Sequence, residues 1–315
     1  MRTDRILAGL LVAGSVAAAS AAWLAGPSRE ASLGLPGSLG GEGIANVALI
    51  DVYGTISDSA DGSLFGGGEG ASSNRLIAAI RDAEKDGVKA ILLRINSPGG
   101  TAAASQAVYQ ELMRVRKDGK IKIIAAMGDV AASGGYYIAA AADHVTALPA
   151  TTTGSIGVIM HLQNIEGLMD KLGIDTRTVQ SGPHKDILSP FRQPTADERA
   201  ILQAQVTETY TQFLNDIVAG RKMPIDKLRP LADGRIYTGS QAQQVGLVDS
   251  LGNWRVALAK AGDLAGIKGE PTVSNYSEPA FWRGLVPRME MKLPGFLPVS
   301  KGVEMPVKVP LALME

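Results

Sequence analysis

Residues 121–142 have the sequence IKIIAAMGDVAASGGYYIAAAA, and this stretch decides how the rest of the chain is interpreted. Its first seven residues are mostly apolar and predict a buried strand, while its last five favour a helix. A short turn of small residues between them brings Ser133 to the amino end of that helix. Free backbone N–H groups and the helix dipole favour negative charge at such an end. Ser133 is therefore a candidate nucleophile, although a serine at this position is also a common helix N-cap.

Strands and helices alternate on both sides of this stretch. Hydrophobic runs predict strands at residues 47–53 and 88–95, and the spacing of apolar residues predicts helices at 74–85 and 102–116. Such alternation is typical of βαβ units, so we expect an α/β fold with a parallel sheet covered by helices. Shorter apolar runs predict three further strands, at residues 143–147, 156–160 and 175–179.

Two loops stand out beside these elements. Residues 96–101, NSPGGT, form a tight turn at the carboxyl end of a predicted strand, where ligands bind in open α/β sheets. Its glycines would let a backbone N–H point into a cleft, although an ordinary βα turn has the same composition. Residues 181–192 form a loop that contains two prolines. A long helix follows, from a capping box formed by Thr195 and Glu198 to Gly220.

The amino-terminal residues predict a membrane segment. Residues 6–26 carry no charge, follow a basic segment at residues 1–5, and could span the roughly 30 Å hydrocarbon core of a bilayer. This apolar run exceeds the usual signal-peptide core of about 7–15 residues, so we expect a retained signal anchor. A signal peptide cleaved near residues 19–21 is the alternative. The positive-inside rule keeps the basic end in the cytoplasm and places the rest of the chain beyond the membrane.

The remaining organisation follows from composition. A Gly/Ser-rich tether is expected at residues 27–43, a catalytic domain at 44–270, and a proline-broken apolar tail at 271–315. The formal net charge is zero, which gives no argument for a nucleic-acid partner. Cysteine is absent, which excludes disulfides and a thiol nucleophile, and no motif indicates a metal or organic cofactor.

A serine nucleophile needs a base that removes its proton. The chain has three histidines, of which His144 and His161 lie beside predicted strands and are expected to be structural. His184 lies in the loop at 181–192, with Lys185 beside it. A lysine can act as a base when it is neutral, which burial against apolar groups favours, and Ser155 could orient its amine. The residues alone do not choose between Lys185 and His184.

Four motifs occur in order along the chain: NSPGG at 96–100, ASGGYY at 132–137, TGSIGV at 153–158 and SGPHKDILSPFR at 181–192. Together they resemble the signal peptide peptidase A family of membrane-anchored bacterial serine peptidases, in its short form with a single catalytic domain. The resemblance covers roughly residues 44–261. It implies a fold similar to that of Clp protease and the crotonases.

The resemblance also implies a Ser-Lys dyad. Ser133 would be the nucleophile, Lys185 the general base, and Ser155 the residue that orients the lysine amine. The oxyanion would be held by backbone N–H groups of Gly134 and of either Gly99 or Gly100. The resemblance implies no metal or other cofactor.

In this family the serine and lysine of one site are thought to come from adjacent subunits, which implies a ring-like homo-oligomer. The ring would stand on the extracytoplasmic side of the bacterial inner membrane, held by a single membrane pass. Its substrates would be remnant signal peptides that stay in the membrane after secretion. A crotonase-type enzyme acting on acyl thioesters, or an inactive membrane scaffold of the same fold, are the alternatives.

Overall fold

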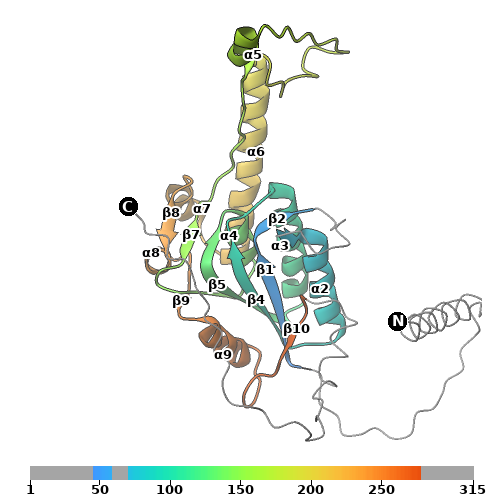
Figure 1. Cartoon of the computed structure of the whole chain (residues 1–315). Coiled ribbons are helices and arrows are strands. Elements are labelled where there is room, and N and C mark those ends of the chain that lie inside the picture. The colour runs from blue at the N-terminus through green and yellow to red at the C-terminus, as the bar shows by residue number, and fades with distance from the viewer. Residues whose placement is uncertain (1–44, 59–69, 278–315) are drawn as a thin grey trace, which may run out of the picture. The chain divides into compact units, whose positions relative to one another are not determined.

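The computed structural model describes residues 45–58 and 70–277 (Figure 1). The predicted membrane anchor at 6–26 and the tether at 27–43 lie outside these residues. Of the predicted tail at 271–315, residues 271–277 are described and contain strand β10 (Val273–Asn275), while the rest lies outside. Within the two described ranges, no helix is both long and apolar enough to cross a membrane.

A parallel sheet lies at the centre of the described residues, and its strand order is β10-β1-β4-β5-β6-β9. The bounds of these strands are β10 Val273–Asn275, β1 Val47–Tyr53, β4 Ala90–Ser97, β5 Lys122–Ala132, β6 His144–Ala147 and β9 Ser250–Leu251. In addition to β6, the long strand β5 pairs with β7 (Thr152–Gly154), and β7 in turn pairs with the antiparallel strand β8 (Ile236–Thr238). A separate parallel pair consists of β2 (Thr55–Ser57) and β3 (Gly70–Ser72).

Helices cover both faces of this sheet. On one face the larger core contains side chains from α2 (Ser73–Lys85), α3 (Ala102–Lys117), α4 (Gly134–Ala139) and the lower part of α6 (Ala196–Arg221). On the other face, α9 (Trp254–Leu264) packs its alanines on β4 and β5. Three short helices complete the fold: α5 Glu166–Leu172, α7 Ile225–Leu228 and α8 Gly239–Gln244. The expected α/β architecture with a helix-covered parallel sheet is confirmed.

The strand β5 continues five residues past the predicted end at Met127. A register shift against β4 occurs there, between Ile95 and Ser97. The Asn96 side chain spans the irregularity, because its Oδ1 accepts a hydrogen bond from the backbone N–H of Val130 at 3.0 Å. This extension carries β5 to the residue before Ser133.

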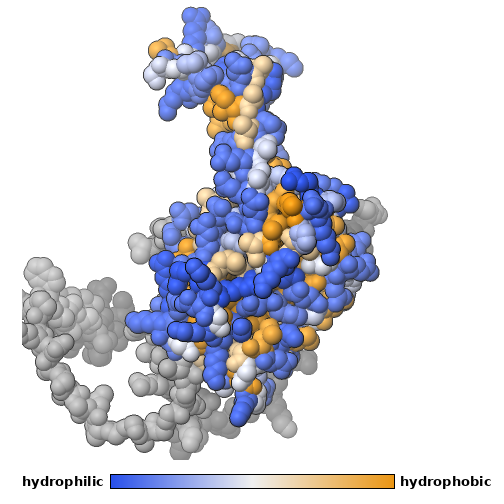
Figure 2. All heavy atoms as spheres, turned by 180° about the vertical axis from the view of Figure 1, so that it is seen from behind, coloured by the Kyte–Doolittle hydropathy of each residue, from blue (hydrophilic) through white to orange (hydrophobic). Residues whose placement is uncertain are grey.

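Two predicted strands are wrong. Residues 156–160 and 175–179 have no strand pairing, although their apolar runs resemble those of buried strands. Residues 175–179 and the last two residues of 156–160 belong to a projection that we call the arm, formed by residues 159–195 together with the amino-terminal half of α6 (Figure 1). Ile156, by contrast, is buried in the larger core. Ile159 is 78% exposed and Val179 is 101% exposed, so the arm carries apolar side chains into solvent. Apolar groups among the polar surface of the arm are visible in Figure 2.

The helix α6 starts as the sequence predicts but ends later. Its capping box is confirmed, since Glu198 N–H donates to Thr195 Oγ1 at 3.2 Å and Thr195 N–H donates to Glu198 Oε2 at 2.8 Å. Gly220 does not end the helix but lies within it, packed on the Ala140 carbonyl, where a Cβ would come within 2.2 Å of the oxygen. Lys222 is the residue that turns left-handed after the last turn, with φ of 53°.

Candidate active site

Ser133 lies at the junction between β5 and α4. Its backbone has φ of 51° and ψ of −118°, a conformation that costs a non-glycine residue on the order of 1–3 kcal/mol. Hydrogen bonds on both sides hold it: Ser133 N–H donates to the Gly154 carbonyl at 2.8 Å, and Tyr137 N–H donates to the Ser133 carbonyl at 2.9 Å. A sharp strand-to-helix turn of this kind exposes a serine Oγ at the end of a sheet.

The turn formed by Gly99 and Gly100 packs against the same junction. A Cβ on Gly99 would lie 2.7 Å from the Gly134 nitrogen, so only glycine permits this approach. The strand β2 holds the turn from the other side, because Ile56 N–H donates to the Gly99 carbonyl and Thr101 N–H donates to the Ile56 carbonyl, both at 2.9 Å. Gly99 N–H donates to Ser97 Oγ at 3.1 Å. Both backbone polar groups of Gly99 are therefore already hydrogen-bonded, one to Ile56 of β2 and one to Ser97.

The N–H of Gly100 differs from that of Gly99. Among the described residues it has no hydrogen-bond acceptor, and the same is true of Gly134 N–H at the start of α4. A Cβ built on Gly134 would lie 3.1 Å from the Gly100 nitrogen, so the two amides are close neighbours. Two free amides beside a serine are the arrangement that stabilises an oxyanion in acyl transfer.

A cavity of about 220 Å³ opens beside Ser133. Small and apolar residues from α3, α4, α6 and the base of the arm form most of its wall. The lining residues are Gly100, Thr101, Ala102, Ser105, Gln106, Ser133, Gly134, Tyr137, Gly157, Val158, Ile159, Thr209, Gln212 and Phe213. None of these lining residues is a histidine, a lysine or a carboxylic acid.

A polar cluster holds in place the part of the cavity wall that Gln106, Tyr137 and Phe213 form. The ring of Tyr137 stacks on Phe213 with 4.2 Å between ring centres, and its hydroxyl donates to the Asp216 carboxylate. Gln106 Nε2 donates to the same carboxylate at 3.3 Å. Burial raises the pKa of Tyr137, so its hydroxyl keeps the proton that it donates. The sequence analysis missed this wall because its residues come from α3, α4 and α6, which are far apart in the chain.

Ser155 lies directly beside the nucleophile candidate. In the pairing of β5 with β7, Ala132 lies opposite Gly154, so Ser133 and Ser155 occupy equivalent positions after the two strands. Ser155 also has a positive φ, of 49°, and its N–H donates to the Arg235 carbonyl at 2.8 Å. The structure therefore brings Ser133, Gly134, Gly100 and Ser155 together.

Lys185 is not part of this group within one chain. It lies exposed in the loop of the arm, and it does not line the cavity beside Ser133. None of the three histidines lines the cavity either. His161 and His184 lie in the arm, and His144 Nε2 lies 2.8 Å from Ser250 Oγ, where burial lowers the pKa of the imidazole. Within the described residues, the cavity at Ser133 therefore lacks a base.

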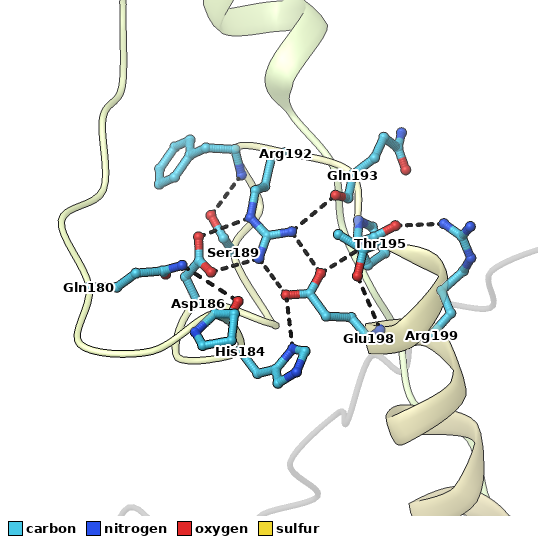
Figure 3. A network of polar contacts seen from close by, with 12 residues as sticks. Gln180, His184, Asp186, Ser189, Arg192, Gln193, Thr195, Glu198 and Arg199 are labelled. Atoms are coloured by element: carbon cyan, nitrogen blue, oxygen red, sulfur yellow. Dashed lines mark hydrogen bonds and ion pairs between the residues drawn. The ribbon is translucent and has the colours of Figure 1, made fainter.

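The loop that carries Lys185 is held by a dense ionic network (Figure 3). Arg192 bonds to Asp186 in the loop and to Glu198 in the first turn of α6, with its closest contacts to both carboxylates at 2.6 Å. The sequence analysis recognised Glu198 as a capping residue but missed Arg192. In the sequence Arg192 lies between Asp186 and Glu198, but only the path of the loop brings the three side chains together. No group of three or more potential metal ligands occurs among the described residues.

Comparison with known proteins identifies the class of this protein. The sequence profile of peptidase family S49 matches residues 115–268, and that of Clp protease matches residues 43–168. A Synechocystis sp. protein provisionally named protease slr0021 is 43% identical over 221 residues, which cover 70% of this chain and 75% of the relative. The chain belongs to the signal peptide peptidase A family, peptidase family S49. Membership makes it a serine peptidase and decides against an acyl-thioester enzyme.

Other members of this family differ more in length. A relative in Enterococcus faecium, provisionally named signal peptide peptidase SppA, is 40% identical over 219 residues, covering 69% of this chain and 63% of the relative. Protease 4 of Salmonella typhi is 36% identical over 251 residues, covering 77% of this chain but 39% of the longer protein. The match to Protease 4 therefore spans well under half of that relative.

Proposed function

We propose that this peptidase cleaves peptide bonds with a Ser-Lys dyad in which Ser133 attacks the carbonyl and Lys185 takes the serine proton. Ser155, directly after β7, orients the lysine amine. The observation that carries the proposal is the strained serine at the head of α4, with two free amides and a cavity beside it. Attack forms the Ser133 Oγ–C bond, the protonated amine then gives its proton to the leaving nitrogen, and water hydrolyses the acyl-enzyme.

The proposed oxyanion hole uses Gly134 and Gly100. Of the two glycines that the sequence left open, Gly100 is favoured because the N–H of Gly99 already donates to Ser97 Oγ. Backbone N–H groups that are fixed before the reaction stabilise the developing charge without reorganisation. The strand β2 keeps the Gly100 amide in this position through its two bonds to the turn.

The proposed substrates are remnant signal peptides. In this proposal, residues 6–26 cross the membrane once and hold the catalytic domain on the extracytoplasmic side. The name of the Enterococcus relative and the uncharged run at residues 6–26 support this assignment. The cavity supports it as well, because its small and apolar lining suits the side chains of a signal-peptide core.

The proposal requires a second copy of the chain. Lys185 is exposed and away from the cavity, and a lysine becomes an effective base when apolar surroundings disfavour its charge. The arm that carries Lys185 exposes large apolar side chains, including Leu172 at 62% and Leu188 at 61%. Packing of the arm on a neighbouring copy would cover these side chains and deliver the amine to that copy's Ser133. A head-to-tail contact of this kind forms a ring when the rotations between neighbouring copies add up to a full turn.

A fluorophosphonate probe tests the nucleophile. We expect covalent labelling of the full-length protein in detergent, with the label mapped to Ser133 by mass spectrometry, and no labelling of Ser133→Ala. Ser155→Ala keeps the Ser133 hydroxyl and is expected to label slowly at the same residue. Labelling at another serine, or none in the wild-type oligomer, would contradict the proposal and favour the inactive scaffold.

Gly100→Ala tests the oxyanion assignment. A Cβ at this position would lie 1.9 Å from the Ile56 carbonyl oxygen, so the turn must move and take the Gly100 N–H with it. Loss of one oxyanion donor is expected to lower kcat by about 10²–10³-fold, measured on a fluorogenic peptide. Gly167→Ala is the matched control, because a Cβ there meets nothing within 4 Å. Unchanged kcat in Gly100→Ala would exclude this amide from the site.

A further inference from the structure

We infer that Arg192, Asp186 and Glu198 form a clamp that positions Lys185 for catalysis, with Arg192 as its central positioning residue. This inference rests on the proposed role of Lys185 as the base. The clamp explains how an exposed loop of the projecting arm can hold the lysine amine at a fixed place.

The guanidinium of Arg192 is fully satisfied by the clamp and its surroundings. Nε and Nη2 donate to the two oxygens of Asp186 at 2.9 and 2.6 Å. Nη1 and Nη2 donate to the two oxygens of Glu198 at 2.7 and 2.6 Å. Nη1 also donates to the Gln193 carbonyl at 3.2 Å. These five bonds equal the number of N–H donors that an arginine has, and a lysine could not reproduce this planar double fork.

The clamp joins the lysine loop to a rigid helix. Glu198 belongs to the first turn of α6, its side chain is 1% exposed, and it also closes the capping box with Thr195. Asp186 is the residue directly after Lys185. His184, directly before Lys185, has its Nδ1 3.9 Å from Glu198 Oε1. The residues on both sides of Lys185 thus contact Glu198 or Arg192, while the Lys185 side chain forms no hydrogen bond or ion pair with the described residues.

The same contacts occupy two carboxylates of the network, one of which belongs to the residue next to Lys185. Hydrogen bonds from Arg192 hold the pKa of Asp186 below its usual range, and with Thr195 N–H they lower the pKa of Glu198 to about 2. Both acids therefore stay ionised at neutral pH and remain bound to Arg192. Without Arg192, these negative charges would be free to pair with the Lys185 ammonium, and a nearby opposite charge favours the protonated form. Among the described residues, the basic side chains within ion-pair distance of Glu198 are those of Arg192 and His184.

The test compares Arg192→Gln with Arg177→Gln in the full-length detergent-solubilised oligomer. Arg177 lies in the same arm and forms an exposed ion pair with Asp175, with side-chain exposures of 85% and 68%. We expect Arg192→Gln to lower kcat by about 10–100-fold, since a misplacement of 1 Å can cost about 10²-fold, while KM stays within about twofold. Its pH–rate profile should also move to higher pH, which a purely structural defect would not cause. Arg177→Gln should match wild type.

Two further variants keep the inference falsifiable. Arg192→Lys preserves the charge but is expected to remain impaired, because it cannot form both forks. Asp186→Asn preserves the shape of the loop and decides the matter if Arg192→Gln does not assemble; we expect a loss of kcat of about tenfold or more. Wild-type kcat and pH profile in Arg192→Gln, beside an inactive Lys185→Ala, would overturn the clamp alone. Wild-type activity in Lys185→Ala would instead overturn the proposed function.

Discussion

Replacing Lys185 with alanine is expected to lower kcat by about 10²–10⁴-fold while the protein still folds and assembles. The loss is large because the cavity beside Ser133 has no lining residue that could take over as a base. The fold survives because the Lys185 side chain is exposed and forms no hydrogen bond or ion pair with the described residues. Steady-state hydrolysis of a fluorogenic peptide gives kcat, and sedimentation together with far-ultraviolet circular dichroism verifies assembly and folding.

Lys171→Ala is the matched control for this prediction. Lys171 lies in α5 of the same arm and is also exposed. Its replacement by alanine therefore removes the same charge from the arm as Lys185→Ala does. We expect the kcat of Lys171→Ala to equal that of the wild type. If Lys185→Ala turns over like the wild type instead, the dyad assignment is wrong. His184, the other base that the sequence left open, would then be the residue to replace.

The sequence predicts the body of the fold well, since local patterns determine it. The strand at 47–53 and the helices at 74–85 and 102–116 each have a clear periodicity, and the structure places them within one or two residues of the predicted bounds. The junction at Ser133 is also predictable, because a buried strand that runs into small residues and then a helix allows few geometries. Capping at Thr195 follows from two residues that are three positions apart.

The arm is the part that sequence patterns misinterpret. Residues 156–160 and 175–179 are apolar, and an apolar run beside turn residues predicts a buried strand. In the structure these residues pair with no strand, and Ile159 and Val179 face solvent. An apolar pattern indicates that side chains become buried, but it does not indicate whether the same chain or another copy buries them. An apolar segment whose partner belongs to another copy is expected to mislead a prediction that considers one chain at a time.

The site is predictable from sequence only in part. The glycines and serines around Ser133 lie in short motifs beside strands that pair in one domain, so the sequence can group them. The clamp at Arg192 was missed because it depends on the path of a loop containing two prolines, which no periodicity encodes. The separation of Lys185 from the cavity could not be predicted from spacing, because the length of α6 sets it. A helix of 26 residues is about 39 Å long and carries its first turn far from the sheet.

Mixing two inactive variants is expected to restore activity if neighbouring copies share each site. Ser133→Ala keeps a functional lysine, and Lys185→Ala keeps a functional serine, so a mixed ring contains some interfaces where both are intact. With random assembly, about a quarter of the interfaces combine an intact serine with an intact lysine, so about a quarter of the wild-type activity should return. Co-expression with two different affinity tags, followed by sequential purification, isolates the mixed rings for the peptide assay.

The control for this experiment pairs Ser133→Ala with the double variant Ser133→Ala, Lys185→Ala. Those mixed rings contain no intact serine, so any activity would reveal wild-type contamination. If verified mixed rings of the two single variants stay inactive, the serine and lysine do not meet across an interface. Movement of the arm within one chain would then have to close the distance between Lys185 and Ser133. The proposed contact between the arm and a neighbouring copy explains both how the base reaches Ser133 and what covers the exposed apolar side chains of the arm. That outcome would therefore also leave these side chains without the partner proposed for them.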